Sequence, residues 1–148
     1  MCAERVANCI FCDDIRAEIG NKFSLMGIYG GDIIFPLPPQ SILVPKFGIL
    51  AQLITDLDDV PDKITITIYI PPNRQEFLKL EMSKPPLEHE EGATKAHLRA
   101  ILQCPPFSVS EEGYIETMID TGRETIRAGR IFVRFFPPSG IPDATPPP

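Results

Sequence analysis

The sequence has no apolar run near the roughly 20 residues that a helix needs to cross a bilayer, and its N-terminus, MCAERVANC, lacks the features of a secretory signal. Basic residues are also few, because 14 Lys and Arg stand against 20 Asp and Glu, which gives a formal net charge of −6. Proteins that bind nucleic acids or anionic membranes depend on basic surfaces. We therefore expect a cytoplasmic protein that binds neither nucleic acid nor membrane.

Residues typical of catalytic centres are equally sparse. The two histidines are His89 and His97, no serine lies in a nucleophile elbow, and no glycine-rich phosphate loop is present. His89 is surrounded by Glu88, Glu90 and Glu91, which we interpret as a polar loop, a metal or acid–base role being the alternative. No catalytic residue and no cofactor are predicted, and we do not expect an enzyme.

The four cysteines are Cys2, Cys9, Cys12 and Cys104, of which Cys9 and Cys12 form a C-x-x-C motif. The motif lies in an expected strand, where a separation of three places the side chains on opposite faces. A zinc site needs converging thiolates and a second pair, and a redox C-x-x-C opens a helix. Free thiols in a reducing cytoplasm are therefore the favoured interpretation.

Proline is the abundant residue, with 17 in 148 positions, and proline doublets divide the chain into short segments. The clearest segment alternates isoleucine with Thr and Tyr from Ile64 to Ile70, as a half-buried strand does. The pattern predicts about eight strands and no helix, which favours an all-β, two-sheet antiparallel sandwich. We expect one domain over residues 1–136 and an extended Pro-rich tail over residues 137–148.

The stretch from Val6 to Phe35 predicts a long β-hairpin with a three-residue loop, Gly20-Asn21-Lys22. A two-residue loop would mix charged and apolar side chains on one face, whereas the three-residue loop separates them. The apolar face then contains three cross-strand pairs: Ile19 with Phe23, Ala17 with Leu25, and Ile15 with Gly27.

The last segment, Arg123 to Phe136, repeats arginine at helical spacing. Gly129 and the following β-branched run favour a strand instead, and a bulge at Ala128-Gly129 reconciles the two patterns. The bulge places all four arginines on the outer face: Arg123, Arg127, Arg130 and Arg134. We consider this face a partner-binding candidate that could clamp a carboxylate, a phosphate or an acidic protein surface. The alternative is an exposed face whose arginines pair with neighbouring acids or protect an edge.

Two acidic groups are further candidates. Asp13, Asp14 and Arg16 lie inside the first arm of the hairpin and, with Asp32, form the candidate ligand site. Asp13 is expected to face Tyr29, unless the hairpin has left the core there or Asp13 caps loop amides. The second group is an acidic loop that could bind a hard cation but lacks the EF-hand pattern, so that a solvated turn is favoured. Its members are Asp56, Asp58, Asp59 and Asp62.

Two stretches resemble known families. FCDDIRAEIGNKFSLMGIYGGDIIF is similar to the first hairpin of a family of uncharacterised bacterial proteins, a resemblance that implies no activity. SEEGYIETMIDTG, together with Phe107, resembles the penultimate strand of immunoglobulin-like sandwiches. This second likeness implies an immunoglobulin-like fold in which the hydroxyl of Tyr114 bonds to nearby backbone. The residues that match the bacterial family are Gly20, Lys22, Leu25, Gly27, Ile28 and Asp32.

The sequence therefore predicts a non-catalytic β-sandwich in a bacterial cytoplasm that binds a protein partner or a second copy of itself. The absence of an assembled catalytic set and the length of strands whose edges must be covered favour this function. The alternative is a module that binds a ligand or a cation through an acidic loop at one end of the sandwich.

Overall fold

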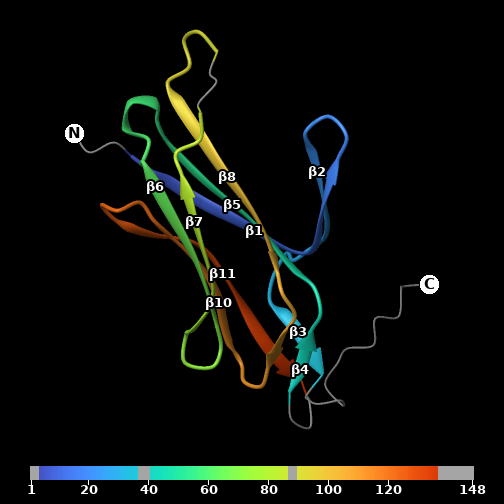
Figure 1. Cartoon of the computed structure of the whole chain (residues 1–148). Helices are drawn as coiled ribbons and strands as arrows, with labels where there is room; N and C mark the ends of the chain where they lie inside the picture. Colours follow the sequence, from blue (N-terminus) through green and yellow to red (C-terminus); the bar gives the residue numbers. More distant parts are fainter. Residues whose placement is uncertain (1–3, 37–40, 87–89, 137–148) are drawn as a thin grey trace.

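The computed structural model describes residues 4–36, 41–86 and 90–136 (Figure 1). This part of the chain consists of strands and loops, with one short 3₁₀ turn, η1 (Leu57–Asp59). Within it, no helix has the length and apolar character that a membrane crossing requires. The predicted tail, residues 137–148, lies outside the described residues.

In the described residues, eleven strands form three sheets. The first sheet has the order β2 (Lys22–Ile28), β1 (Val6–Glu18), β5 (Phe47–Asp56) and β8 (Lys95–Cys104). The second has the order β3 (Ile33–Pro36), β11 (Thr125–Phe136), β10 (Gly113–Asp120), β6 (Lys63–Ile70) and β7 (Gln75–Ser83). The third joins β4 (Ile42–Val44) to β9 (Phe107–Val109).

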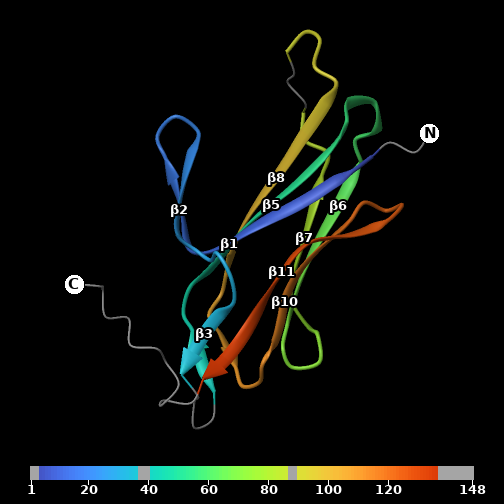
Figure 2. The same ribbon diagram turned by 180° about the vertical axis from the view of Figure 1, so that it is seen from behind.

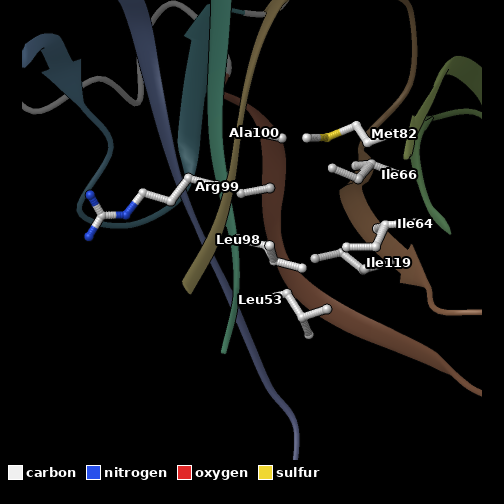
Figure 3. Close-up of a pocket in the computed structure, with 9 residues that line it drawn as sticks. Leu53, Ile64, Ile66, Met82, Leu98, Arg99, Ala100 and Ile119 are labelled. Carbon is white, nitrogen blue, oxygen red and sulfur yellow. The ribbon is translucent and has the colours of Figure 1, made fainter. Parts of the chain in front are cut away.

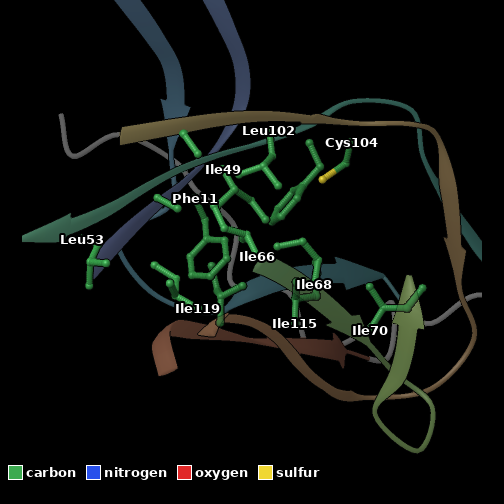
Figure 4. Packing of buried hydrophobic residues seen from close by; sticks show 14 of the residues in the cluster. Phe11, Ile49, Leu53, Ile66, Ile68, Ile70, Leu102, Cys104, Ile115 and Ile119 are labelled. Atoms are coloured by element: carbon green, nitrogen blue, oxygen red, sulfur yellow. The ribbon is translucent and has the colours of Figure 1, made fainter. Parts of the chain in front are cut away.

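The two larger sheets enclose one hydrophobic core. Alternate residues of each strand point inward, so that Phe11, Ile49 and Leu102 from the first sheet face Ile68 and Ile115 from the second (Figure 4). Each of these five side chains is at most 7% exposed. Burying aliphatic and aromatic side chains of this size contributes about 1.5–3 kcal/mol apiece, so the contact between the sheets is the main stabilising term.

The alternating patterns were predicted correctly. All four isoleucines from Ile64 to Ile70 are buried in β6, which pairs antiparallel with β7. The bulge in β11 is confirmed as well, because Thr117 pairs with Gly129 and Met118 with Arg127, which leaves Ala128 without a partner on β10. The arginines of this segment consequently lie exposed on the outer face.

The all-β prediction is confirmed, whereas the count of about eight strands in two sheets is not. The stretch between Pro36 and Pro45 contains β4, which pairs with β9 in a separate small sheet. β3 leaves the expected hairpin and joins the second sheet parallel to β11. Tyr114, expected at an immunoglobulin-type corner, lies on the outer face of β10 with its ring against Phe132.

The predicted hairpin register was wrong by two residues. Glu18 pairs with Lys22, so the loop is Ile19-Gly20-Asn21 and not Gly20-Asn21-Lys22, although its length of three is as predicted. Gly20 and Asn21 both have positive φ, 83° and 58°, and thereby close the turn one position earlier than expected. A shift of two residues keeps every side chain on its face, so the apolar face survives.

The hairpin leaves the body of the molecule part-way along β1. The first half of β1 pairs with β5 from Val6 to Cys12, and the second half pairs with β2 from Cys12 to Glu18. β1 is the only strand with which β2 pairs. In the two opposite views the β1–β2 tip stands apart from the rest of the first sheet and from the second sheet (Figures 1 and 2).

Candidate functional site

We name the projecting part of the hairpin, residues Asp13 to Ile28, the hairpin arm. One of its faces is apolar and extends from the root of the arm to the loop. Two side chains on this face are strongly exposed, Ile19 at 94% and Phe23 at 48%. The apolar face is made up of Ile15, Ala17, Ile19, Phe23 and Leu25. Single exposed apolar residues are ordinary, but a continuous group on a projecting element marks an interaction surface.

The opposite face of the arm carries charges of both signs, at Asp14, Arg16, Glu18 and Lys22. Ser24 lies among them and donates a hydrogen bond of 2.8 Å from its hydroxyl to the carboxylate of Glu18. Near the root the same face also carries two exposed apolar side chains, Met26 at 44% and Ile28 at 57%. The two faces therefore differ most clearly towards the loop, where the charges gather on one side.

The root of the arm is fixed by Asp13 and Tyr29. The hydroxyl of Tyr29 donates a hydrogen bond of 2.5 Å to the Asp13 carboxylate, so the predicted approach of these residues is found. Burial and the neighbouring negative charge raise the pKa of Tyr29. The carboxyl group of Asp13 lies over Gly27, where a side chain would collide with it and where φ is +66°.

The other members of the predicted ligand site separate. Asp14 forms ion pairs with Arg16 at 3.3 Å and with Lys46 at 3.9 Å. Asp32 pairs with Arg134 of β11 at 3.0 Å. The predicted group is therefore divided between the arm and the second sheet, and each of these two acids has its own cation.

The four predicted arginines share the outer face but contact different neighbours. Arg123 pairs with an acid of the η1 turn, and Arg127 lies 3.9 Å from the carboxylate of Glu116. Arg130 lies over the ring of Tyr114 and Arg134 over that of Phe132, at 4.1 and 5.2 Å from the ring centroids. These contacts match the alternative in which the arginines pair with neighbouring groups.

Sequence reasoning missed a fifth arginine on this face. Arg74 follows the Pro71-Pro72 turn, lies 4.0 Å over the ring of Tyr69 and bonds Glu116 at 2.7 Å. Its φ is +54°, a left-handed backbone conformation that turns its side chain back over β6. The regular spacing that revealed the β11 arginines does not extend to a residue in a turn.

The four aspartates of the acidic loop do not converge. Asp56 forms an ion pair with Lys95 at 2.5 Å. Asp59 lies between two arginines, with one carboxylate oxygen 3.0 Å from Arg5 and the other 2.9 Å from Arg123. Asp58 and Asp62 are exposed. In the described part of the chain, no cluster of three or more His, Cys, Asp or Glu side chains could hold a metal ion.

Arg5 is a second residue that sequence reasoning missed. Its side chain is only 5% exposed, and its guanidinium donates to the backbone and carboxylate of Asp59, the hydroxyl of Thr121 and the carboxylate of Glu124. It thereby joins the start of β1 to η1 and to the β10–β11 turn. A single charged residue before a strand carries no pattern that could have revealed this role.

The cysteines contained in the described residues are free: Cys9, Cys12 and Cys104. Burial raises the pKa of the Cys9 and Cys104 thiols to about 11, and burial followed by the charge of Asp13 raises that of Cys12. Thiols with raised pKa values are poor nucleophiles and poor metal ligands at neutral pH. Cys2, His89 and Glu88 lie outside the described residues.

A small gap lies in the core between the two large sheets (Figure 3). Apolar side chains line it, including Leu53, Leu98 and Ile119, while Arg99 points away from it. Its volume of about 10 Å³ corresponds to one water molecule at most. The gap therefore has no room for a ligand.

No model of a known protein family matches this chain, and no curated protein matches it. Function is therefore inferred from the arrangement of the side chains. The hairpin arm is the feature of interest, because the fold itself does not require it.

Proposed function

We propose that this chain is a non-catalytic, immunoglobulin-like β-sandwich module that mediates protein–protein interaction or self-association through its hairpin arm in a bacterial cytoplasm. The observation that carries the proposal is the exposure of Ile19 and Phe23 at the end of an arm whose strand β2 pairs with β1 alone among the described strands. The free thiols support a reducing compartment.

The energetics of the arm favour a role outside the fold. An isolated two-stranded hairpin is marginally stable in water and usually gains stability by packing on further strands or on a helix. The arm has such packing only at its root, where Ile15 lies against Gly48 of β5, and β2 pairs with β1 alone among the described strands. Covering its apolar face would contribute about 25 cal/mol for each Å² of apolar surface removed from water, and a bound polypeptide supplies that cover.

A ligand- or cation-binding module is the alternative, and the geometry favours it less. Asp56 and Asp59 are paired with cations of the same chain, and Asp14 and Asp32 likewise. A carboxylate that is already paired must lose its partner before it can ligate a metal ion. The arm, in contrast, is free to bind as it stands.

The test is photo-crosslinking from the arm. Phe23 is replaced by p-benzoylphenylalanine, the chain is irradiated in cells of its native host, and adducts are identified by mass spectrometry. The matched control carries the same amino acid at Leu43 of β4, which is 62% exposed but lies on the body. We expect one dominant adduct from position 23 that position 43 does not give. Equal adducts from both positions, or none from position 23, would overturn the proposal.

A further inference from the structure

We infer that the partner of the hairpin arm is a second copy of the chain, joined by antiparallel pairing of β2 with β2 about a two-fold axis at Ser24. This inference rests on the proposed function and names its partner. It follows from the free edge of β2, from the length of its regular segment and from the side chains that the pairing brings together.

The outer edge of β2 presents the backbone groups of its odd-numbered residues. The amide of Ile15, whose partner on β2 is Leu25, donates to the side chain of Gln103 at 3.4 Å, so within the arm the even-numbered residues exchange hydrogen bonds between β1 and β2. Along an antiparallel pair the direction of these groups alternates, and the N–H and C=O groups of Phe23 and Leu25 therefore point away from β1. Such an unpaired row is a template for another strand.

The regular part of this edge is short and symmetric. It is bounded by two residues with positive φ, Asn21 at 58° and Gly27 at 66°, which interrupt the extended backbone. The five residues between them have Ser24 at their centre. A two-fold axis at Ser24 places Ser24 opposite its own copy as a non-hydrogen-bonded pair and pairs Phe23 with Leu25 of the second copy on either side of the axis, and so uses every free group of the segment. Two such hydrogen-bonded pairs make about four backbone hydrogen bonds.

The same register aligns the side chains of the two arms. On the apolar face, Phe23 of one copy lies opposite Leu25 of the other, twice over, and aromatic–aliphatic cross-strand pairs stabilise a sheet. The apolar face then continues across four strands. On the polar face, Lys22 lies between Glu18 of its own arm and, beyond Met26, Asp14 of the second copy. Charges of opposite sign therefore alternate across the interface between the two β2 strands.

The other edges of the two large sheets are protected against such pairing. β3 has four residues and ends at Pro36, whereas β7 carries Glu76, Lys79 and Glu81 at exposed positions. β8 carries exposed charge and is followed by two prolines. Short length, proline and charge are the features that prevent edge-to-edge association. β2 has a single charged residue, Lys22, at its first position.

The joint is small. Two arms that meet along five residues bury less surface than the roughly 1,200–2,000 Å² of a standard interface, so we expect a dimer that exchanges rapidly. Its mass in solution should consequently depend on protein concentration. Covalent trapping at the two-fold axis is the more sensitive assay.

The experiment combines two variants, at Ser24 and at Phe23. In Ser24→Cys the two new thiols would lie on Cα atoms about 4.5 Å apart, within the range that a disulfide spans. Under a mild oxidant we expect this variant to form a covalent dimer at least tenfold faster than Ser108→Cys, which changes an exposed serine on β9. Phe23→Pro removes an amide that points away from β1, so we expect sedimentation to show at least tenfold weaker association with an unchanged circular dichroism spectrum.

Trapping of Ser24→Cys no faster than that of Ser108→Cys would overturn the inference, as would a chain that stays monomeric at every concentration. If Phe23→Pro proves misfolded, the trapping result alone decides. If trapping fails while position 23 crosslinks to a different protein, the second copy is excluded and the proposed function stands. If both experiments fail, both proposals fall.

Discussion

Gly129 of β11 lies directly against Cys9 of β1, so that a Cβ atom added at position 129 would be 2.5 Å from the cysteine sulfur. β1 belongs to the first sheet and β11 to the second. The missing side chain therefore permits the two sheets to approach one another at this point. Gly129 also follows the unpaired residue of the β11 bulge, where the strand bends.

Substitution Gly129→Ala should therefore lower the free energy of unfolding by about 1–3 kcal/mol, the usual cost of overpacking a core. Urea denaturation measures this, with Gly31→Ala as the control because no atom lies within 4 Å of a Cβ there. In a Cys9→Ala background the loss should shrink. An equal loss in both backgrounds would mean that the sulfur contact is not its cause.

Arg5 and Arg123 share the carboxylate of Asp59 and should differ greatly in their contribution to stability. The Arg5 side chain is 5% exposed and that of Arg123 is 75% exposed. We expect Arg5→Ala to cost about 3 kcal/mol, because it leaves partly buried acceptors without a donor. Arg123→Ala should cost less than about 1 kcal/mol. Chemical denaturation of both variants tests this, and equal losses would contradict the assigned role of Arg5.

The Cys104 thiol predicts a dependence of stability on alkaline pH. Burial raises its pKa from 9.0 to about 11, so between these values the folded chain holds a proton that the unfolded chain has released. The contribution of this thiol is complete below pH 9 and is lost as the pH rises to about 11, at most roughly 2–3 kcal/mol. Cys104→Ala should flatten the fall in unfolding free energy over that window. A fall as steep as in the unmodified chain would refute the prediction.

Tyr29 should ionise later than an ordinary tyrosine. Burial is the first cause of its raised pKa, followed by the hydrogen bond to Asp13 and the charge of that residue. In a Tyr69→Phe/Tyr114→Phe background, absorbance at alkaline pH reports Tyr29 alone. Asp13→Asn removes the charge, so the midpoint should move down while remaining above the ordinary value, because burial is unchanged. An unmoved midpoint would show that Asp13 does not contribute.

The sequence was sufficient to predict whichever features depend on side-chain alternation. The isoleucines of β6 and the bulge at Ala128 were found because hydrophobic side chains have to face the core at every second position. Alternation does not distinguish registers that differ by two residues, and for this reason the hairpin loop was placed wrongly. Turn backbone angles at Gly20 and Asn21 decided the register instead.

Contacts between distant segments could not be predicted. β3 pairs in parallel with β11, one hundred residues further along the chain, and the local sequence pattern does not indicate which sheet edge a short strand will join. Arg5 is a similar case, since its partners come from η1 and from the β10–β11 turn. Among the candidate sites, the outward direction of the β11 arginines could be predicted from their spacing. Their neighbours, including Arg74, could not, because the order of the strands in the second sheet determines them.

β1 is one uninterrupted strand of 13 residues whose two halves belong to different parts of the molecule. A partner bound to the second half of β1 would therefore be connected to the core by a rigid strand and not by a flexible linker. A partner would be presented at a set angle to the body, and twisting or pulling on it would load the strand at Cys12, the position where the two halves meet.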